Sequence, residues 1–413
     1  MSREQGVGRK ISKCNILPYP DLNIQCLPTR GAHSDLKSYF IGNLSKFKLK
    51  IFDAAHRPIP LFPFFIFCFL SAAFLHAGGV KDKQAALDKA QADEWAAIGE
   101  PRVMAFPAVL TPGEACAVIY VHPQGKMPEG LDGRAALYNE AGKKIAEAAL
   151  FPYPLDEAGH GAQAAILSPP STCTPGKATI RITSMTKRPS QNEGKAESAS
   201  GTASGTIIIA ERKFAAENIP LNPSNTSLRT ESDPKKTAES ARLWAILSTT
   251  GTAIYSTGPF LTPVPADTRR SSFFGDRRVY QYSNGKSDTA VHAGIDYAVP
   301  KGTPVHAPAD GKVALACPRI VTGNSIILEH LPGVYSMYYH LETINVQEGD
   351  SVRTGDIIGL SGSTGLSTGP HLHWEIRAAT ENTDPDAFTA HPILNRELIM
   401  EKLFAISISS DLK

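Results

Sequence analysis

The sequence predicts an all-β protein with two β domains and few, short helices. Short runs of alternating apolar and polar residues recur between turns, and the 413 residues include 33 Gly and 31 Pro. This pattern is typical of antiparallel strands joined by tight turns. A chain of this length is also too long for a single core, which favours more than one domain.

The charge balance and the cysteine spacing exclude several classes of function. The chain has 42 Lys and Arg against 40 Asp and Glu, without a basic block carrying interleaved aromatic residues. A nucleic-acid-binding surface is therefore not expected. The six cysteines form no C-x-x-C pair, so neither a structural zinc knuckle nor a thioredoxin-like motif is indicated. Cys116 and Cys173 either form a disulfide in an oxidising compartment or remain buried thiols.

An apolar run near the N-terminus predicts export. The stretch "PLFPFFIFCFLSAAFLHAGG" (Pro60 to Gly79) follows the basic stretch "KFKLKIFDAAHR" and ends in small residues. Residues 46–79 thus match a secretory signal, and the apolar run is short for a bilayer crossing. We expect a periplasmic or cell-envelope location, with membrane association only if this segment stays uncleaved. Residues 1–45 show no clear periodicity, and we interpret them as a disposable leader or untranslated upstream sequence.

Residues 80–185 are predicted to form a β-sandwich, after a short helix in "KDKQAALDKAQADEWAAIGE". The runs "ACAVIYVHP", "AAILSPPS" and "GKATIRITS" alternate and are broken by turns. Several such runs within a hundred residues favour two packed antiparallel sheets. The segment "TPGEACAVIYV...GKKIAEAALFPY...ILSPPSTCTPGKATIRI" resembles the immunoglobulin-like domain that precedes some secreted peptidases.

A linker and a connecting region are expected next. Residues 186–206 are rich in Ser, Gly, Ala and charge and lack large apolar side chains, which predicts a flexible linker. Residues 207–262 combine the strand-like run "IIIAERKF" with a helix in "DPKKTAESARLWAILS". In this helix Asp233 is the expected N-cap and Pro234 the first helical residue. The expected apolar face contains Leu243, Trp244 and Leu247.

Residues 263–392 are predicted to form an antiparallel β domain, followed by a C-terminal helix and tail over residues 393–413. The segments "TPVHAPADGKVALAC", "NSIILEHLPGVYSMYYHL" and "GDSVRTGDIIGLSG" each contain a strand, a turn and a second strand. Pro is confined to the edges of these runs, and Gly stands at the reversals.

Histidines recur on three separate β segments of this domain. His292 and Asp296 stand in "VHAGIDY", His340 ends "YSMYYH", and His371 and His373 stand in "TGPHLHWEIR". Alternate residues of a strand point to one face, so His371 and His373 can project into one groove. A lone histidine in a β domain is ordinarily structural. The histidines interpreted in that way are His122, His160, His306 and His330.

The residues around the H-x-H pair have simpler interpretations. The segment "GSTGLSTG" (Gly362 to Gly369) lacks the G-K-[ST] ending of a phosphate loop and leads into a strand, which argues against nucleotide binding. We expect it to form a turn shortly before His371. Glu375 is expected to form a salt bridge or to face solvent. Tyr338 and Tyr339 are expected mainly in the core.

Three segments in order carry a family resemblance. "SSFFGDRR", "HAGIDYAVPKGTPVHAPADGKV" and "MYYHLETINVQEGDSVRTGDIIGLSGSTGLSTGPHLHWEIR" resemble the M23 (LytM/lysostaphin-type) zinc endopeptidases of bacterial cell walls. The resemblance covers roughly Arg270 to Arg377. It implies a LytM-type peptidase fold and one zinc ion held by His292, Asp296 and His373.

The same resemblance implies that His340 and His371 are the catalytic pair. Two imidazoles and one carboxylate leave the fourth position of tetrahedral zinc for water. We assign His371 as the general base and His340 as the hydrogen-bond donor to the oxyanion, two roles that can be exchanged.

The expected function is a secreted zinc metalloendopeptidase that acts on peptide stems and cross-links of peptidoglycan. One alternative is a catalytically inactive module that binds the wall or activates another wall hydrolase. Such a module would be expected to lose ligands or catalytic histidines, whereas all five positions carry the required residue type. The other alternative is a zinc endopeptidase that acts on glycine-rich proteins.

Overall fold

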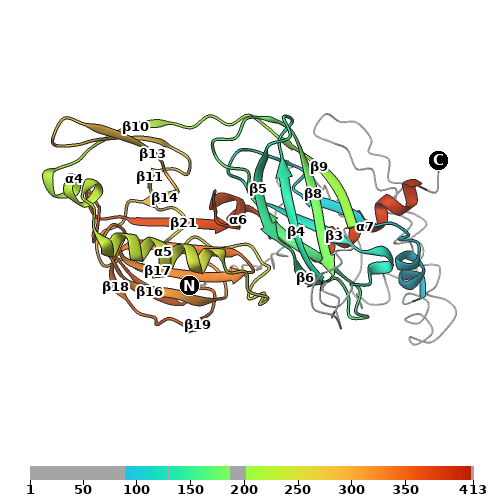
Figure 1. Cartoon of the computed structure of the whole chain (residues 1–413). Helices are drawn as coiled ribbons and strands as arrows, with labels where there is room; N and C mark the ends of the chain where they lie inside the picture. The colour runs from blue at the N-terminus through green and yellow to red at the C-terminus, as the bar shows by residue number, and fades with distance from the viewer. Residues whose placement is uncertain (1–88, 128–130, 187–200, 411–413) are drawn as a thin grey trace, which may run out of the picture. The chain divides into compact units, whose positions relative to one another are not determined.

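The computed structural model describes residues 89–127, 131–186 and 201–410 (Figure 1). The predicted leader and signal-like segment, residues 1–79, lie outside them. The described chain consists mainly of β-strands, as the sequence predicted, and nearly all of it falls in one unit, Ala90–Lys413. In this part of the chain, every helix is too short or too polar to cross a membrane.

The first domain is a β-sandwich, as predicted. One sheet has the strand order β1-β3-β7-β6 and the other β2-β9-β8-β4-β5. Inward-facing side chains of both sheets, such as Val118 and Ile180, form a shared apolar core. The likeness of this sandwich to an immunoglobulin domain stays a prediction. Its strands are β1 (Arg102–Phe106), β2 (Val109–Leu110), β3 (Cys116–Val121), β4 (Leu131–Tyr138), β5 (Lys144–Ala149), β6 (Phe151–Pro154), β7 (Gly161–Leu167), β8 (Gly176–Thr186) and β9 (Gly201–Ile209).

The two cysteines of the sandwich are free thiols. Cys116 is buried in the core, and Cys173 packs against the same cluster. Of the two interpretations offered by the sequence, the structure therefore has the unpaired thiols.

The predicted linker over residues 186–206 is partly wrong. Thr186 ends β8, and β9 already begins at Gly201, opposite Ser184 of β8. The small side chains of "GTASGT" offer little apolar surface, but their backbone amides and carbonyls still pair with β8. Composition alone therefore misassigned residues 201–206, while residues 187–200 lie outside the described chain.

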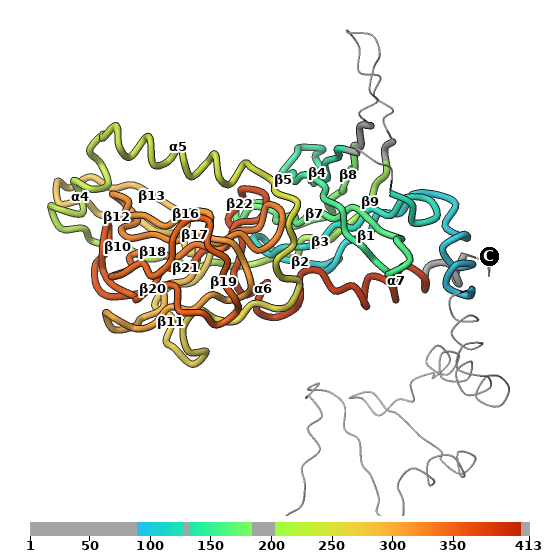
Figure 2. Tube along the Cα trace, turned by 90° about the horizontal axis from the view of Figure 1, so that it is seen from below, coloured from blue at the N-terminus to red at the C-terminus, as the bar shows by residue number. Residues whose placement is uncertain are grey.

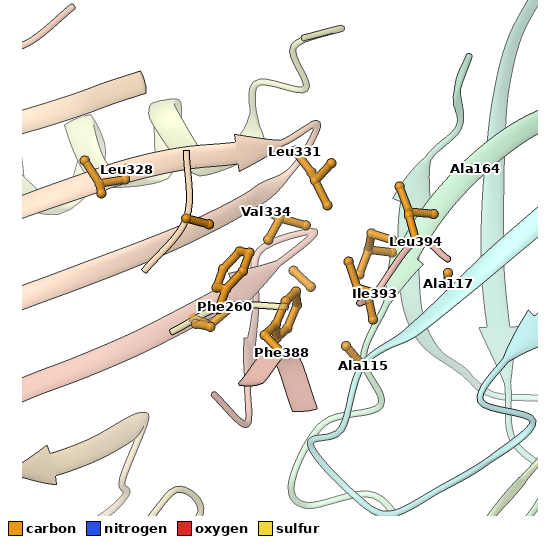
Figure 3. Close-up of a cluster of buried hydrophobic side chains, with 14 of the residues drawn as sticks. Ala115, Ala117, Ala164, Phe260, Leu328, Leu331, Val334, Phe388, Ile393 and Leu394 are labelled. Atoms are coloured by element: carbon orange, nitrogen blue, oxygen red, sulfur yellow. The ribbon is translucent and has the colours of Figure 1, made fainter. Parts of the chain in front are cut away.

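The second domain is built on a ten-stranded antiparallel sheet in the order β11-β14-β21-β18-β17-β16-β19, with β15, β20 and β22 attached beside it. A large apolar cluster packs against one face. Figure 3 shows part of it, where Phe260 and Phe388 lie beside Leu331 and Val334. The strands are β11 (Arg270–Ser272), β14 (Gly294–Tyr297), β15 (Pro304–His306), β16 (Gly311–Arg319), β17 (Gly323–Leu331), β18 (Val334–Ile344), β19 (Ser351–Val352), β20 (Ile357–Ser361), β21 (Leu372–Ala378) and β22 (Glu381–Thr383).

The connecting region contributes a strand to a second, three-stranded sheet of this domain. In this sheet β10 (Ala216–Pro220) runs parallel to β12 (Arg277–Gln281), which pairs with β13 (Ser287–Val291). Helix α4 (Pro223–Thr230) follows β10 directly. A domain boundary at residue 263, as the sequence suggested, therefore separates β10 from the strand that it pairs with.

Helix α5 (Pro234–Ser248) covers the opposite face of the large sheet (Figure 2). As predicted, the Asp233 carboxylate caps it by accepting from the backbone N–H of Lys235 at 2.7 Å. Leu243 and Leu247 pack on the sheet, but Trp244 is 54% exposed, contrary to the prediction. One residue turns a helix by about 100°, so Trp244 cannot share the face of Leu243.

Two helices end the chain. They are α6 (Asp386–Ala390) and α7 (Arg396–Ser410), and α7 is the helix that the sequence predicted. The side chain of Asn395 accepts from the backbone N–H of Leu398 at 2.9 Å, and Ile399 and Leu403 are buried.

Candidate metal centre and active site

The three predicted metal ligands lie together on neighbouring segments. Asp296 on β14 pairs with His373 on β21, and His292 lies in the short connection between β13 and β14. Oδ1 of Asp296 lies 2.7 Å from Nδ1 of His373 and 3.2 Å from Nε2 of His292, and the two nitrogens are 3.1 Å apart. All three side chains are buried.

This donor set fits a divalent transition metal. Zinc binds histidine nitrogen and carboxylate oxygen at about 2.1 Å, so tetrahedral donors stand about 3.4 Å apart. The distances of 2.7 to 3.2 Å between the three donor atoms are close to that separation. Two imidazoles and one carboxylate also leave a fourth position open, as in catalytic zinc sites.

Each candidate ligand has an outer partner that leaves one donor atom facing the others. The Nδ1–H of His292 donates to the carbonyl of Phe273 at 2.8 Å, which leaves Nε2 as an acceptor. The Nε2–H of His373 donates to Oε1 of Glu375 at 3.0 Å, which leaves Nδ1. Oδ2 of Asp296 accepts from Arg278, which leaves Oδ1. Such outer partners set the tautomer and orientation of metal ligands.

The electrostatics of the triad favour metal-binding forms of two of its members. Burial tends to raise the pKa of Asp296, but His373 and His292 outweigh burial and hold that pKa well below its usual range. Burial lowers the pKa of His292, so its ring is neutral. Burial also acts to lower the pKa of His373, but Asp296 and Glu375 outweigh it and raise the pKa to about 9. A metal ion must therefore displace a proton from His373.

His373 is held from two sides. Burial acts to raise the pKa of Glu375, but Arg377 and His373 outweigh it and lower the pKa to about 2, so the carboxylate stays charged. Glu375 also accepts from Arg377 at 3.2 Å, which is the salt bridge expected from the sequence. The ring of Tyr339 stacks on His373 with centroids 5.5 Å apart, so Tyr339 supports this candidate ligand from within the core.

The predicted catalytic pair lies beside the triad. Nε2 of His371 is 3.9 Å from Oδ1 of Asp296, and the rings of His340 and His371 are 4.7 Å apart. The Nδ1–H of His371 donates to the carbonyl of Gly369 at 2.8 Å, and that of His340 donates to the carbonyl of Thr364 at 2.7 Å. In its neutral form each ring therefore carries an unprotonated Nε2.

The loop from Gly362 to Gly369 positions both histidines. It provides the two carbonyls that hold the rings, and Gly362 pairs with His371. Gly365 has a φ of +72°, and a Cβ on it would lie 2.4 Å from the backbone nitrogen of Gly323. The loop thus packs its backbone directly on the turn before β17, which agrees with the expected turn.

The remaining histidines that the sequence marked as structural have protein partners of their own. His122 bonds Gln163, His160 bonds Asp156, His306 bonds the carbonyl of Gly355, and His330 bonds the carbonyl of Asp310. Sequence reasoning missed Arg278 and its partner Glu217, which lies 61 residues earlier on β10. No local motif links the two, because only the folding of β10 onto β12 brings them together.

Comparison with known proteins identifies the segment that carries this site. Residues 290–385 match the model of peptidase family M23. They form an M23 peptidase domain. This domain contains the triad and the histidine pair, and it begins after Arg278 and Glu217.

Relatives of the M23 domain include named peptidases. The chain is 46% identical over 95 residues to the DD-carboxypeptidase/endopeptidase Mpg of Neisseria meningitidis and 40% identical over 114 residues to the peptidoglycan DD-endopeptidase ShyA of Vibrio cholerae. These matches cover 23% and 28% of this chain but only 22% and 26% of the two relatives. A crystal structure of an M23 peptidase from Pseudomonas aeruginosa aligns over 69% of this chain and 96% of its own length, with 24% identity and a TM-score of 0.45.

Proposed function

We propose that this protein is an exported zinc metalloendopeptidase that hydrolyses peptide cross-links of bacterial peptidoglycan. The observation that carries the proposal is the buried triad of His292, Asp296 and His373 inside an M23 domain. The names of the relatives, which include peptidoglycan DD-endopeptidases, support the substrate class. The signal-like segment at residues 46–79 supports a periplasmic or envelope location.

Zinc held by the triad would act as a Lewis acid that polarises the scissile carbonyl and makes water more acidic. The chain itself supplies the proton acceptors. Because the Nδ1–H of His371 and of His340 is committed to a backbone carbonyl, each neutral ring presents Nε2 as an acceptor. His371 is the ring with Nε2 beside the triad, so we assign it the role of general base.

The role of oxyanion donor places a further demand on His340. Its Nε2 can donate only when it carries a proton, and the Thr364 carbonyl already binds the proton of the neutral ring at Nδ1. Burial and the neighbouring His371 lower the pKa of His340 to about 3, so solvent does not protonate this ring near pH 7, and in this proposal the second proton reaches it by relay from His371. The two histidines act in this proposal as a coupled pair and not as two fixed, separate roles.

The pairing of both histidines with backbone carbonyls also bears on the inactive-module alternative. A module that only binds the wall has no need of two imidazoles oriented beside a metal site. Here both rings are oriented by the same loop, which favours the enzyme.

The test is a digestion of purified peptidoglycan of known cross-link chemistry, with products identified by mass spectrometry and zinc measured in the same samples. We expect cleaved cross-links with the wild type, zinc retention without turnover in His371→Ala, and loss of zinc in His373→Ala. His306→Ala is the matched control. Among the described residues its imidazole bonds only the Gly355 carbonyl of the same domain, so this variant should keep zinc and turnover. Stoichiometric zinc without any product from the wild type would contradict the enzyme and favour a binding module.

A further inference from the structure

A charged pair outside the M23 domain reaches the candidate metal centre. Arg278 on β12 donates from Nη2 to Oδ2 of Asp296 at 2.6 Å and from Nε to Oε1 of Glu217 on β10. The same Glu217 oxygen accepts from the hydroxyl of Ser272 at 2.9 Å. Glu217, Arg278 and Asp296 thus form a continuous chain of charge-assisted hydrogen bonds that ends on a metal ligand.

The planarity of the groups transmits orientation along this chain. A guanidinium holds its donors in a rigid fork, so a bond at Nε sets the direction in which Nη2 points. A carboxylate is also planar, so a bond at Oδ2 sets the direction of Oδ1. Oδ1 of Asp296 is the atom that faces His292 and His373. Through Arg278, Glu217 is thus linked to the direction in which the metal-facing oxygen points.

Charge adds to this geometric effect. The side chain of Arg278 is only 12% exposed, and its positive charge lies beside the position that a metal ion held by the triad would occupy. Without a second acid, this guanidinium would repel the metal at short range. Glu217, which is 31% exposed, supplies the compensating negative charge.

We infer that Glu217 is a positioning residue for the metal centre, acting through Arg278 to fix the Asp296 carboxylate. The segment that begins at β10 is then part of the metal-binding unit and not a connector between two domains. The inference rests on the proposed function in one respect, which is that the triad binds zinc.

The experiment is a competition titration of the full chain with Zn²⁺ against a chromophoric chelator, in Glu217→Ala, Glu217→Gln and wild type. Loss of a direct partner of a metal ligand typically weakens metal affinity by about 10- to 100-fold. Glu217 acts one step farther out, through Arg278, so we expect Glu217→Ala to lie at the lower end, about 10-fold. Glu217→Gln keeps an acceptor for Arg278 but not the charge, so its loss should be severalfold and smaller. Asp288→Asn is the matched control. Asp288 lies on β13 of the same small sheet but pairs with Arg229 of helix α4, so the zinc affinity of this variant should equal that of the wild type.

Thermal unfolding of the zinc-free proteins separates positioning from a purely structural role. If Glu217→Ala lowers metal-free stability but binds zinc as the wild type does, the inference is overturned. If Glu217→Ala does not fold, the zinc affinity of Glu217→Gln tests the inference instead. A zinc affinity equal to that of the wild type in Glu217→Gln would overturn it. A wild type without zinc affinity would overturn the proposed function as well, whereas tight wild-type binding with an unaffected Glu217 series overturns this inference alone.

Discussion

Acid should destabilise this protein through one buried histidine that lies away from the metal centre. His330 on β17 is fully buried, donates from Nδ1 to the carbonyl of Asp310 at 2.8 Å, and accepts at Nε2 from the hydroxyl of Ser336 at 2.7 Å. The hydroxyl of Ser336 is in turn 2.7 Å from the hydroxyl of Tyr338. The centroid of the Phe260 ring lies 4.7 Å from that of the His330 ring. The two partners of the ring, a backbone carbonyl and a hydroxyl, suit a neutral imidazole, and neither is a carboxylate.

The sign and the size of the effect follow from the pKa of this ring. Burial lowers the pKa of His330 from 6.5 to about 4, against a smaller opposing effect of Asp310. Below pH 6.5 the unfolded chain gains a proton that the folded chain refuses, so stability falls as the pH drops from 6.5 to 4. The full loss is about 3 kcal/mol, of which about 2.5 kcal/mol is lost by pH 4.5.

The assay is urea unfolding of the wild type and of His330→Gln at pH 7 and at pH 4.5. The metal-centre histidines titrate in both proteins, so the difference between the two proteins isolates His330. We expect the wild type to lose about 2.5 kcal/mol more than the variant between the two pH values. An equal loss in both proteins would refute the reasoning, because the buried ring would then not be the group that resists protonation.

Three further predictions concern the metal centre. Glu375→Gln keeps an acceptor for His373 but loses the charge that Arg377 balances. It should weaken zinc affinity by about 10- to 100-fold in a chelator competition. Wild-type affinity in this variant would show that Glu375 does not support His373 as a ligand. Gly294→Ala would place a Cβ 2.1 Å from the carbonyl oxygen of Trp374, so it should lower the free energy of unfolding, measured in urea, by about 2 kcal/mol or more. Gly258→Ala is the control, because a Cβ there would have no atom within 4 Å and should be tolerated. Asn225→Ala removes a 3.0 Å hydrogen bond to the carbonyl of Ser367, in the loop that holds His371. A hydrogen bond of this kind contributes about 1 kcal/mol, so its loss should lower turnover of peptidoglycan about fivefold without changing the zinc content. Equal losses of zinc and turnover would contradict that last assignment.

Most strands could be predicted because apolar and polar residues alternate along them, which reflects the burial of one face of the strand. In β8, Ile180 and Ile182 face the core of the sandwich while Arg181 between them is exposed, and the sequence pattern shows this directly. The exceptions are strands that pair through the backbone without burying large side chains. Gly201–Thr206 of β9 and the edge strand β10 are of this kind, and neither has an apolar face for a pattern to report.

The candidate site was predictable where its residues share a strand or a short motif. His371 and His373 are two apart on one segment, and His292 precedes Asp296 by four residues. The partners from other segments were not predictable, because their distance in sequence carries no signal. Glu217 depends on the parallel pairing of β10 with β12, and Phe273 contributes only its backbone carbonyl.

The pairing of β14 with β21 explains why His373 is placed as a candidate ligand and Glu375 as its partner. Both side chains point to the same face of β21, so parity alone cannot separate them. In this strand pair, His373 of β21 stands opposite Asp296 of β14, whereas Glu375 of β21 stands opposite Gly294 of β14. Glycine provides no donor atom, and a side chain there would collide with the Trp374 carbonyl. Donor atoms therefore converge at the Asp296–His373 pair, and the Glu375 carboxylate, with no donor across from it, is left to bind the far nitrogen of His373.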